Sequence, residues 1–176
     1  MPKRRVKRHS VTQPLDKPYR YIPLTRNQIA VVDASDFEWL DQWNWCAAWS
    51  DFTKSFYAQR YRGVSMAREI LGCEKGEDAE HWNGNTLDNR RQNLRKATRQ
   101  QNCQNRKMRS DSKCGFKGIR WHKADSNWQV RIQHQGKRLH GGSFHTAEEA
   151  ARAYDTIAQR LYGQFARLNF PQAASQ

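Results

Sequence analysis

Residues 80–105 read EHWNGNTLDNRRQNLRKATRQQNCQN, and this stretch decides the fold of the middle of the chain. Asn83-Gly84-Asn85 suits a tight turn, because glycine and asparagine tolerate a positive φ angle. Thr98 precedes Gln101 by three residues, the spacing of a capping box, so Thr98 is predicted to cap a helix that begins after it. The stretch therefore predicts a tight turn and, after it, the start of a helix.

Acidic, histidine and asparagine residues recur through this stretch at a defined spacing. Glu80 precedes His81, Asn93 follows twelve residues after the histidine, and Asn102 lies nine residues further on. In this pattern the stretch resembles the HNH nucleases, and more narrowly the homing endonucleases of phages and mobile introns, whose core often reads DH-x-NGN-x-LDNR-x-x-NLR. The resemblance implies a ββα-metal (His-Me finger) nuclease module in which His81 is the general base and Asn93 orients it or braces the loop. It also implies that Glu80 and Asn102 hold one metal ion.

Hydrolysis of a phosphodiester needs a base to activate water and a cation to neutralise the charge that develops on the phosphate. Only two protein oxygen ligands are implied for the metal, which favours Mg²⁺ or Mn²⁺ as the cofactor. The resemblance therefore implies a site-selective DNA endonuclease that nicks one strand per active site. The arginines expected to hold the DNA backbone around this site are Arg90, Arg91, Arg95, Arg99 and Arg106.

Two departures from the family pattern motivate an alternative. Glu80 stands where the homing endonucleases commonly have aspartate, and the extra methylene moves a metal-binding oxygen by about 1 Å, enough to matter in a catalytic geometry. Ala67 stands where the segment before the core has a histidine in some phage enzymes. The alternative function is a catalytically inactive DNA-binding regulator built on the same modules.

Short apolar and β-branched runs dominate residues 20–79 and predict a β-rich leader before the ββα unit. The expected elements are strands at 21–24 and 28–32, a helix at 36–43 capped by Ser35 or Asp36, a hairpin of 45–49 with 56–61, and a third run at 64–71. The aromatic residues of this segment are expected in the core rather than stacked on bases, because it is the one acidic block of the chain.

The last third of the chain predicts a three-stranded antiparallel sheet packed on one helix. Strands are expected at 118–121, 128–133 and 137–140, with a hairpin turn at Gln135-Gly136. Thr146 and Glu149 form a second capping box, which opens a helix to about Tyr162 with an alanine-rich apolar face. An alanine-rich face lets a helix lie close against a small sheet.

The run GIRW…W-x-V-x-I…G-K-R…G-S-F-x-T-A-E-E-A-A-x-A-Y-D…A-x-L-N-F is similar to the plant ethylene-response-factor (Apetala-type) DNA-binding domain over residues 114–171. This resemblance implies that the sheet enters the major groove of double-stranded DNA, with some side chains on bases and others on phosphates. Trp128 is expected either on DNA or in the core. The implied base-reading residues are Arg120, His122, Trp128 and Arg131, and the implied phosphate contacts are Lys117, Lys123, Lys137 and Arg138.

The net charge supports a polyanionic partner. Lysine and arginine number 31 against 17 aspartate and glutamate, which gives +14. Residues 1–20 carry +6, 21–79 carry −3, 80–112 carry +5 and 113–176 carry +6, so the positive charge lies at the two ends and in the ββα stretch. Such an excess is typical of proteins that bind nucleic acid. The basic residues 1–19 are expected to form a disordered tail that either solubilises the chain or binds phosphates.

Other classes are disfavoured by what the sequence lacks. It has no run of 18 apolar residues and no apolar segment after its basic N-terminus, so we expect no membrane span, no secretion and a cytoplasmic location in a bacterial or phage-infected cell. The four cysteines form no CxxC pair, which disfavours a disulfide framework and a structural zinc site. Whether the chain is a monomer or a homodimer stays open.

These observations predict an α+β protein with two folded domains. The predicted organisation is a tail at 1–19, an HNH domain at 20–110 with its core at 80–106, a linker at 111–113, an Apetala-type domain at 114–171 and a short tail at 172–176.

Overall fold

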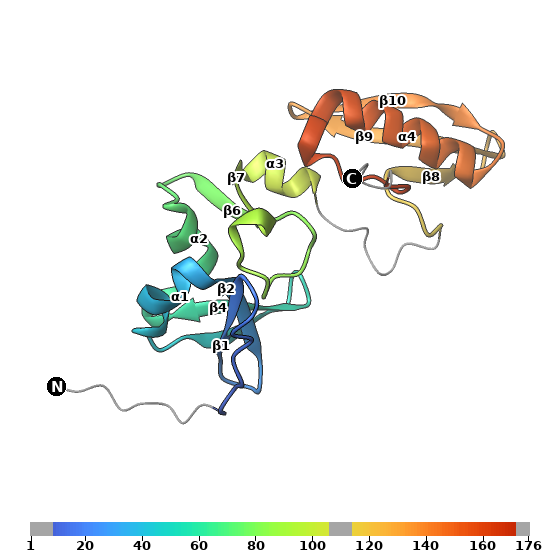
Figure 1. The fold of residues 1–176 in the computed structure, drawn as a ribbon. Coiled ribbons are helices and arrows are strands. Elements are labelled where there is room, and N and C mark those ends of the chain that lie inside the picture. Colours follow the sequence, from blue (N-terminus) through green and yellow to red (C-terminus); the bar gives the residue numbers. More distant parts are fainter. Residues whose placement is uncertain (1–8, 106–113, 172–176) are drawn as a thin grey trace. The chain divides into compact units, whose positions relative to one another are not determined.

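Short strands alternate with short helices along the chain, which a computed structural model describes over residues 9–105 and 114–171 (Figure 1). The chain divides into two compact units, residues 1–99 and 100–176. The mixed α and β composition, and a final three-stranded sheet packed on a helix, agree with the predicted fold class. The predicted linker at 111–113, the tail at 172–176 and the first eight residues of the N-terminal tail lie outside the described residues.

The first unit consists of hairpins joined by short helices. A β1–β2 hairpin, a β3-β4-β5 sheet and a β6–β7 hairpin make up its strands, and all their pairings are antiparallel. The elements are β1 (Tyr19–Pro23), β2 (Ile29–Asp33), α1 (Ala34–Asp41), β3 (Cys46–Ser50), β4 (Ser55–Arg60), η1 (Tyr61–Gly63), β5 (Val64–Ser65), α2 (Met66–Leu71), β6 (Glu77–His81), η2 (Arg91–Asn93) and β7 (Leu94–Thr98).

The predicted strands and hairpins of this unit are found within two residues of their expected ends, but two helical segments differ. The first helix begins at Ala34, after Asp33 rather than Ser35 or Asp36, so Trp43 lies beyond its end and is 41% exposed. The run at 64–71 forms a two-residue strand and then helix α2, whose buried Met66 and Ile70 are spaced one turn apart. The run forms a helix because its apolar residues are buried at helical spacing. A short apolar run alone does not distinguish such a helix from a strand.

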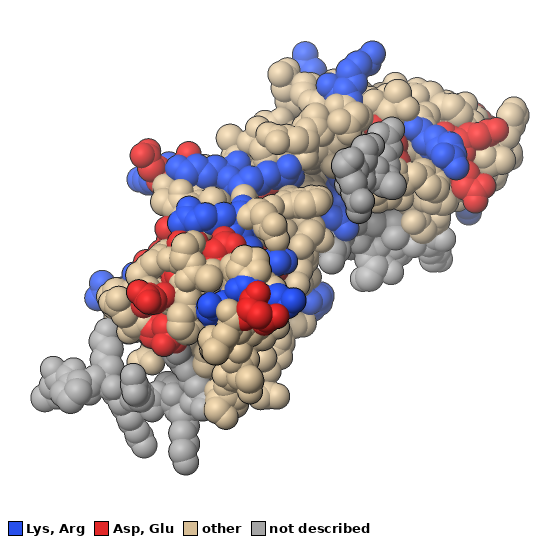
Figure 2. Space-filling view, in the orientation of Figure 1, with Lys and Arg blue, Asp and Glu red and all other residues tan. Residues whose placement is uncertain are grey.

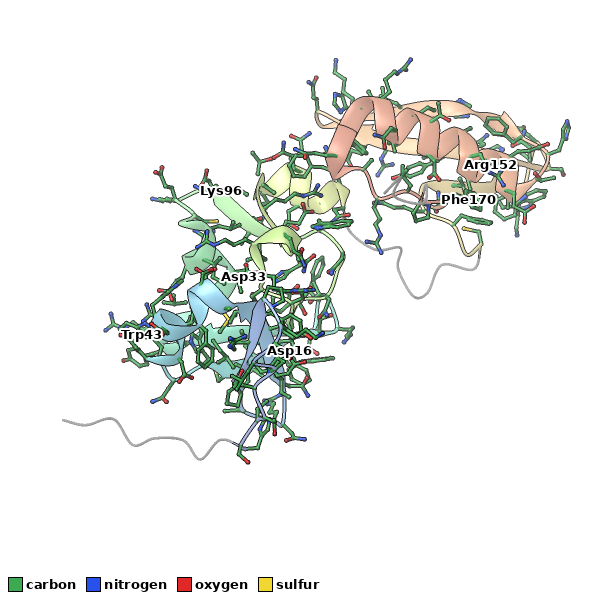
Figure 3. The ribbon with its side chains drawn as sticks, viewed as in Figure 1. Asp16, Asp33, Trp43, Lys96, Arg152 and Phe170 are labelled. Carbon is green, nitrogen blue, oxygen red and sulfur yellow. The ribbon has the colours of Figure 1, made fainter. Side chains whose placement is uncertain are left out.

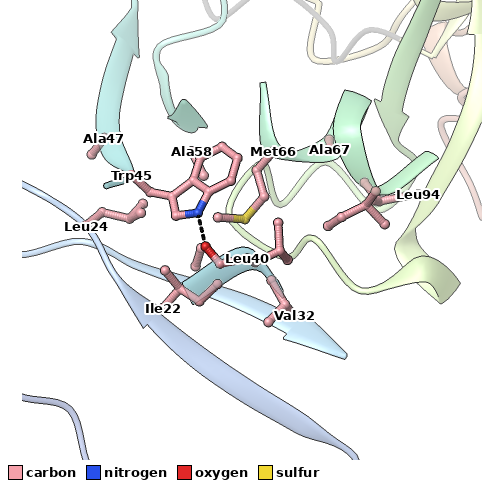
Figure 4. Packing of buried hydrophobic residues seen from close by; sticks show 12 residues of the cluster. Ile22, Leu24, Val32, Leu40, Trp45, Ala47, Ala58, Met66, Ala67 and Leu94 are labelled. Atoms are coloured by element: carbon pink, nitrogen blue, oxygen red, sulfur yellow. Dashed lines mark hydrogen bonds between the residues drawn. The ribbon is translucent and has the colours of Figure 1, made fainter. Parts of the chain in front are cut away.

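The core of the first unit gathers around Trp45. This side chain is 1% exposed, and its indole N–H donates to the carbonyl oxygen of Leu40 at 2.7 Å (Figure 4). A buried indole needs such a partner, because an unpaired N–H in an apolar interior costs about 1–3 kcal/mol. The buried residues around it come from β1, β2, β3, β4, α2, β7 and the residue after β1, and include Ile22, Leu24, Val32, Ala47, Ala58, Met66, Ala67 and Leu94. The aromatic core expected for this segment is therefore confirmed for Trp45.

Part of the predicted N-terminal tail is attached to β1. The Gln13 side chain donates to the Tyr21 carbonyl at 2.8 Å and accepts from the Tyr21 N–H at 2.9 Å. The guanidinium of Arg20 also donates to the carbonyl of Pro14 at 3.1 Å. These contacts hold the described end of the tail beside the first hairpin.

The second unit is built on an antiparallel sheet with strand order β10-β9-β8, and helix α4 covers one face of it (Figure 1). Its elements are β8 (Ile119–His122), β9 (Asn127–His134), β10 (Lys137–Phe144), α4 (Ala147–Tyr162) and η3 (Gly163–Phe165), and helix α3 (Arg99–Gln104) begins directly after Thr98. Both bonds of the predicted capping box are present, with Glu149 N–H to Thr146 Oγ1 at 3.2 Å and Thr146 N–H to Glu149 Oε2 at 3.1 Å.

Alanines bring α4 close to the sheet, as the sequence predicted. Ala150, Ala151 and Ala158 are fully buried, and Val130 and Ile132 face them from β9. Strand β10 carries a bulge between His140 and Ser143, so the two ends of the strand pair with β9 in registers that differ by one residue. No helix in residues 9–105 and 114–171 is long and apolar enough to cross a membrane.

Candidate nucleic-acid interface

The face of the β8–β10 sheet opposite α4 carries arginine and glutamine side chains. Residues paired directly across an antiparallel sheet point to the same face. Ile119 pairs with Val130 on the helix side, so the alternating partners Arg120 and Gln129 lie on the open side. The same alternation places on the open face the pairs Arg131 with His140 and Gln133 with Arg138.

The arginines of this open face are exposed. Arg120, Arg131 and Arg138 are all exposed, whereas Gln129 is 8% exposed. An Arg131 guanidinium nitrogen lies 3.4 Å from Gln129 Oε1, a long hydrogen bond that leaves most of the guanidinium donors directed elsewhere. The arginines are therefore available to an anionic partner.

The structure separates the residues predicted to contact DNA into three groups. Arg120, His122, Arg131 and Arg138 share the open face, and His122 Nδ1 lies 3.1 Å from Asp125. Lys123 and Lys137 are exposed at strand ends, while Lys117 is half-buried and its ammonium donates to the Gln104 carbonyl at 2.5 Å. Trp128 lies on the helix side, where it packs partly buried against the core, so of its two expected roles the structure supports the core role.

Sequence reasoning missed two members of this neighbourhood. His140 lies on the open face opposite Arg131. It could have been predicted there, because side chains two residues apart in a strand share a face and Arg138 lies on this one. Trp121 is 42% exposed and packs edge-on against Trp128 with ring centroids 5.3 Å apart. The position of Trp121 could have been predicted from strand alternation, because it directly follows Arg120 and so lies on the opposite side of the strand.

In the first unit, His81 is buried at the end of β6. It is 8% exposed, its Nε2 lies 3.1 Å from Asn89 Oδ1, and its ring packs against Tyr57 with centroids 6.2 Å apart. The Asn89 amide nitrogen donates to the Leu87 carbonyl at 3.2 Å, so its oxygen is left to accept from the imidazole. Asn89, which the sequence did not single out, therefore holds the ring.

Asn93 braces the turn that follows β6, as one of its two predicted roles required. It is 2% exposed, and its side-chain oxygen accepts from the Asn83 N–H at 3.2 Å. Its amide nitrogen donates to the carbonyls of Asp88 at 2.8 Å and Asn85 at 3.4 Å. Asn93 thus fixes the loop and does not contact the imidazole through any of these bonds.

Three of the arginines predicted to hold DNA are ion-paired within the first unit. Arg90 pairs with Asp88 at 2.7 Å, Arg91 grips buried Asp36 with two bonds of 2.8 Å, and Arg95 pairs with Glu80 at 2.5 Å. Figure 2 shows basic and acidic side chains interleaved over this unit. These guanidinium groups stabilise the fold. Of the other two predicted arginines, Arg99 is exposed at the start of α3, and Arg106 lies outside the described residues.

Glu80 and Asn102, the residues expected to hold a metal ion, lie in β6 and in α3. Glu80 is 3% exposed and one of its oxygens is taken by Arg95, while the other, Oε1, is buried without a hydrogen-bond partner. Over residues 9–105 and 114–171, no three His, Cys, Asp or Glu side chains gather into a group that could hold a metal ion.

The burial of His81 predicts a pH-dependent stability. Burial lowers the pKa of His81 below the ordinary value of 6.5, and the hydrogen bond with Asn89 offsets this only in part. The unfolded chain therefore binds a proton more readily, so the free energy of unfolding should be unaffected by this group above about pH 6.5 and should fall as the pH drops below it. Urea titrations of the full chain between pH 7 and pH 5 measure this slope.

His81→Gln should flatten the decline in that pH window, whereas His145→Gln, at an exposed position of the second unit, should leave it unchanged. Equal slopes for the wild type and His81→Gln would contradict the assignment.

Comparison with known proteins gives one family match and several relatives. Residues 114–164 match the AP2 domain family, which confirms the Apetala-type resemblance of that segment. Dehydration-responsive element-binding protein 2A of Arabidopsis thaliana is 46% identical over 68 residues, covering 36% of this chain, and 2E of Oryza sativa subsp. japonica is 48% identical over 60 residues, covering 33%. The chain spans only 19% of the length of each of these plant relatives.

Protein 3.8 of Escherichia phage T7 is 32% identical over 115 residues, which cover 65% of this chain and 94% of the phage protein.

These matches correct the prediction of a metal-dependent endonuclease, which is wrong as the main function. The AP2 match and the plant relatives, which are named as element-binding proteins, stand against this reading, and none of the relatives named above is described as a nuclease. The divalent cation, Mg²⁺ or Mn²⁺, was expected only as part of that chemistry, and nothing in the structure tests it. In the predicted nuclease segment the structure shows an antiparallel β6–β7 hairpin, in or beside which Glu80, His81 and Asn93 are buried.

Proposed function

Since the chain belongs to the family of Protein 3.8 of Escherichia phage T7 and carries an AP2 domain at residues 114–164, we propose that it is a regulator that binds double-stranded DNA. The proposed binding element is the open face of the β8–β10 sheet. The single observation that carries the proposal is that this AP2 sheet leaves three exposed arginines on the face opposite its helix.

The chemistry of the open face suits the major groove. A strand ribbon fits that groove, arginine can bind the O6 and N7 of guanine with two hydrogen bonds, and glutamine can do the same at adenine N6 and N7. Arg120, Arg131 and Gln133 lie on the open face and include both of these side-chain types. We assign base contacts to them and assign phosphate contacts to Lys123, Lys137 and Arg138, which lie near the ends of the strands.

The charge of the second unit supports an electrostatic contribution to binding. Residues 113–176 carry +6, whereas many arginines of the first unit are neutralised by internal pairs. Phosphate contacts release counterions, so the affinity should fall steeply as the salt concentration rises.

The test is selection of a preferred duplex from random-sequence DNA, followed by titration with variants of the full chain. Arg120→Ala combined with Arg131→Ala should weaken binding to the selected duplex by about 2–6 kcal/mol, because each bidentate base contact is worth about 1–3 kcal/mol. Arg160→Ala removes one arginine charge, against two in the double variant, from the exposed side of α4 and should change the affinity little. Equal affinities for the double variant and Arg160→Ala would refute the proposed face.

A second arm of this experiment addresses catalysis directly. Supercoiled plasmid incubated with the wild-type chain and Mg²⁺ or Mn²⁺ should remain supercoiled to the same extent as with His81→Ala. Nicking by the wild type that His81→Ala abolishes would contradict a purely regulatory role.

A further inference from the structure

The segment that follows α4 returns to the helix and is held there by Asp155 and Asn169. One carboxylate oxygen of Asp155 accepts from the Asn169 backbone N–H at 2.8 Å and from its side-chain amide at 3.0 Å. The other oxygen accepts from the Phe170 N–H at 2.8 Å. Phe170 in turn lies against Arg152 of α4, with the guanidinium carbon 4.5 Å from the ring centroid (Figure 3). We call Asp155 and Asn169 the carboxy-terminal clamp.

The clamp binds the backbone of Lys117, which lies two residues before β8. Asn169 Oδ1 accepts from the Lys117 N–H at 2.6 Å, and its amide nitrogen donates to the Lys117 carbonyl at 3.1 Å. One asparagine therefore satisfies both backbone groups of a residue 52 positions earlier in the chain. The next residue, Gly118, accepts from the Arg131 N–H at 2.8 Å, so the clamp lies directly beside the first bond between β8 and β9.

Strand β8 needs such an anchor. It has four residues, and in the strand order β10-β9-β8 it lies at an edge, bonded to β9 alone. Short edge strands have few bonds to hold their register. The open-face residue of β8 closest to the clamp is Arg120, which pairs with Gln129 beside Arg131. Movement of β8 would therefore move Arg120 relative to Arg131.

We propose that Asp155 and Asn169 are positioning residues for DNA binding, which fix the register of β8 and so hold Arg120 beside Arg131 on the open face. This inference rests on the proposed function. It extends the binding machinery past the matched AP2 segment, because Asn169 lies beyond residue 164 and bonds to Lys117 and Asp155.

The decisive experiment is a double-mutant cycle on binding to the selected duplex, at a temperature where each full-length variant is folded. Asn169→Ala should weaken binding about 10-fold, the equivalent of one or two lost hydrogen bonds. In the Arg120→Ala background, Asn169→Ala should lower the affinity for the duplex less than about 2-fold, because the effects of coupled residues are not additive. Equal losses in the two backgrounds would mean that Asn169 acts on the unit as a whole, which overturns the proposal.

Hydrogen exchange gives a readout that does not depend on DNA. In Asn169→Ala, exchange at the amides of Ile119–His122 should accelerate about 10-fold or more, while those of β9 that bond to β10 keep their rates, because opening is local. Thr156→Ala, beside Asp155 on α4, is the matched control and should change neither exchange nor binding. Unchanged exchange in β8 would overturn the proposal.

If Asn169→Ala does not fold, a pair of charge-changing substitutions in the clamp tests the same proposal. Asn169→Asp puts two carboxylates together and should weaken binding, and adding Asp155→Asn should recover part of that loss by restoring a donor between them. Absence of recovery counts against the clamp. If the wild-type chain binds no duplex, the proposed function itself is overturned. If the wild type binds and every clamp variant binds equally well, only the role of the clamp is overturned.

Discussion

Gly118→Ala should destabilise the second unit by about 3 kcal/mol, the upper part of the range for overpacked cores. A Cβ atom at this position would lie 2.0 Å from the Cδ2 and Cε2 atoms of Tyr154. Tyr154 is 3% exposed and sits between α4 and the sheet, so its ring has little room to move. Thermal or urea unfolding of the full chain, followed by a signal from the second unit, measures the loss.

A matched control separates this clash from backbone strain. Gly115 has a φ angle of +72°, against +77° at Gly118, but a Cβ there would meet no atom within 4 Å. Gly115→Ala therefore has the same conformational penalty, about 1 kcal/mol, without the steric one. Equal destabilisation by the two substitutions would show that close contact with Tyr154 is not the reason for glycine at position 118.

Arg95→Met should destabilise the first unit by about 3–5 kcal/mol, because it leaves a buried carboxylate without its countercharge. Glu80, the partner, is 3% exposed, and the pair joins two residues that face each other across β6 and β7. The expected result is a marked fall in the urea midpoint at neutral pH.

Restoring electroneutrality provides the control for this prediction. Adding Glu80→Gln to Arg95→Met should recover most of the lost stability, since a buried amide costs far less than a buried charge. Arg91→Met removes an arginine from the same segment and leaves buried Asp36 without this countercharge, so it should show the same kind of loss. A stable Arg95→Met variant would mean that Glu80 is neutral or held by another group.

The sequence predicted best where local rules decide structure. The capping box at Thr146, the hairpin turn at Gln135-Gly136 and the alternation along β9 are all set by residues within a few positions of each other, and the second unit follows them closely. The run at 64–71 was harder to assign, because short apolar runs fit a strand or a buried helix equally well.

Roles that depend on distant partners could not be predicted. The arginines at 91 and 95 looked available for DNA, but Asp36 lies 55 residues away from Arg91 and nothing in the local sequence indicates their pairing. Asn89 as the partner of His81, and the grip of Asn169 on Lys117, are likewise products of the folded chain. A basic composition predicts a polyanionic partner, but folding decides which of the basic groups remain free to meet it.

The bulge in β10 has a consequence for how insertions and deletions would act on this sheet. Before it, even-numbered residues such as Arg138 share a face with Arg131. After it, odd-numbered Ser143 takes that face, and Phe144 pairs with Trp128 on the helix side. Loss of one residue at Gly141-Gly142 would remove the bulge and leave a regular ladder, in which Ser143 still lies opposite Gln129 and Phe144 still lies opposite Trp128. The bulge takes up one extra residue of β10. One continuous strand therefore directs Arg138 to the open face near one end and Phe144 to the core near the other.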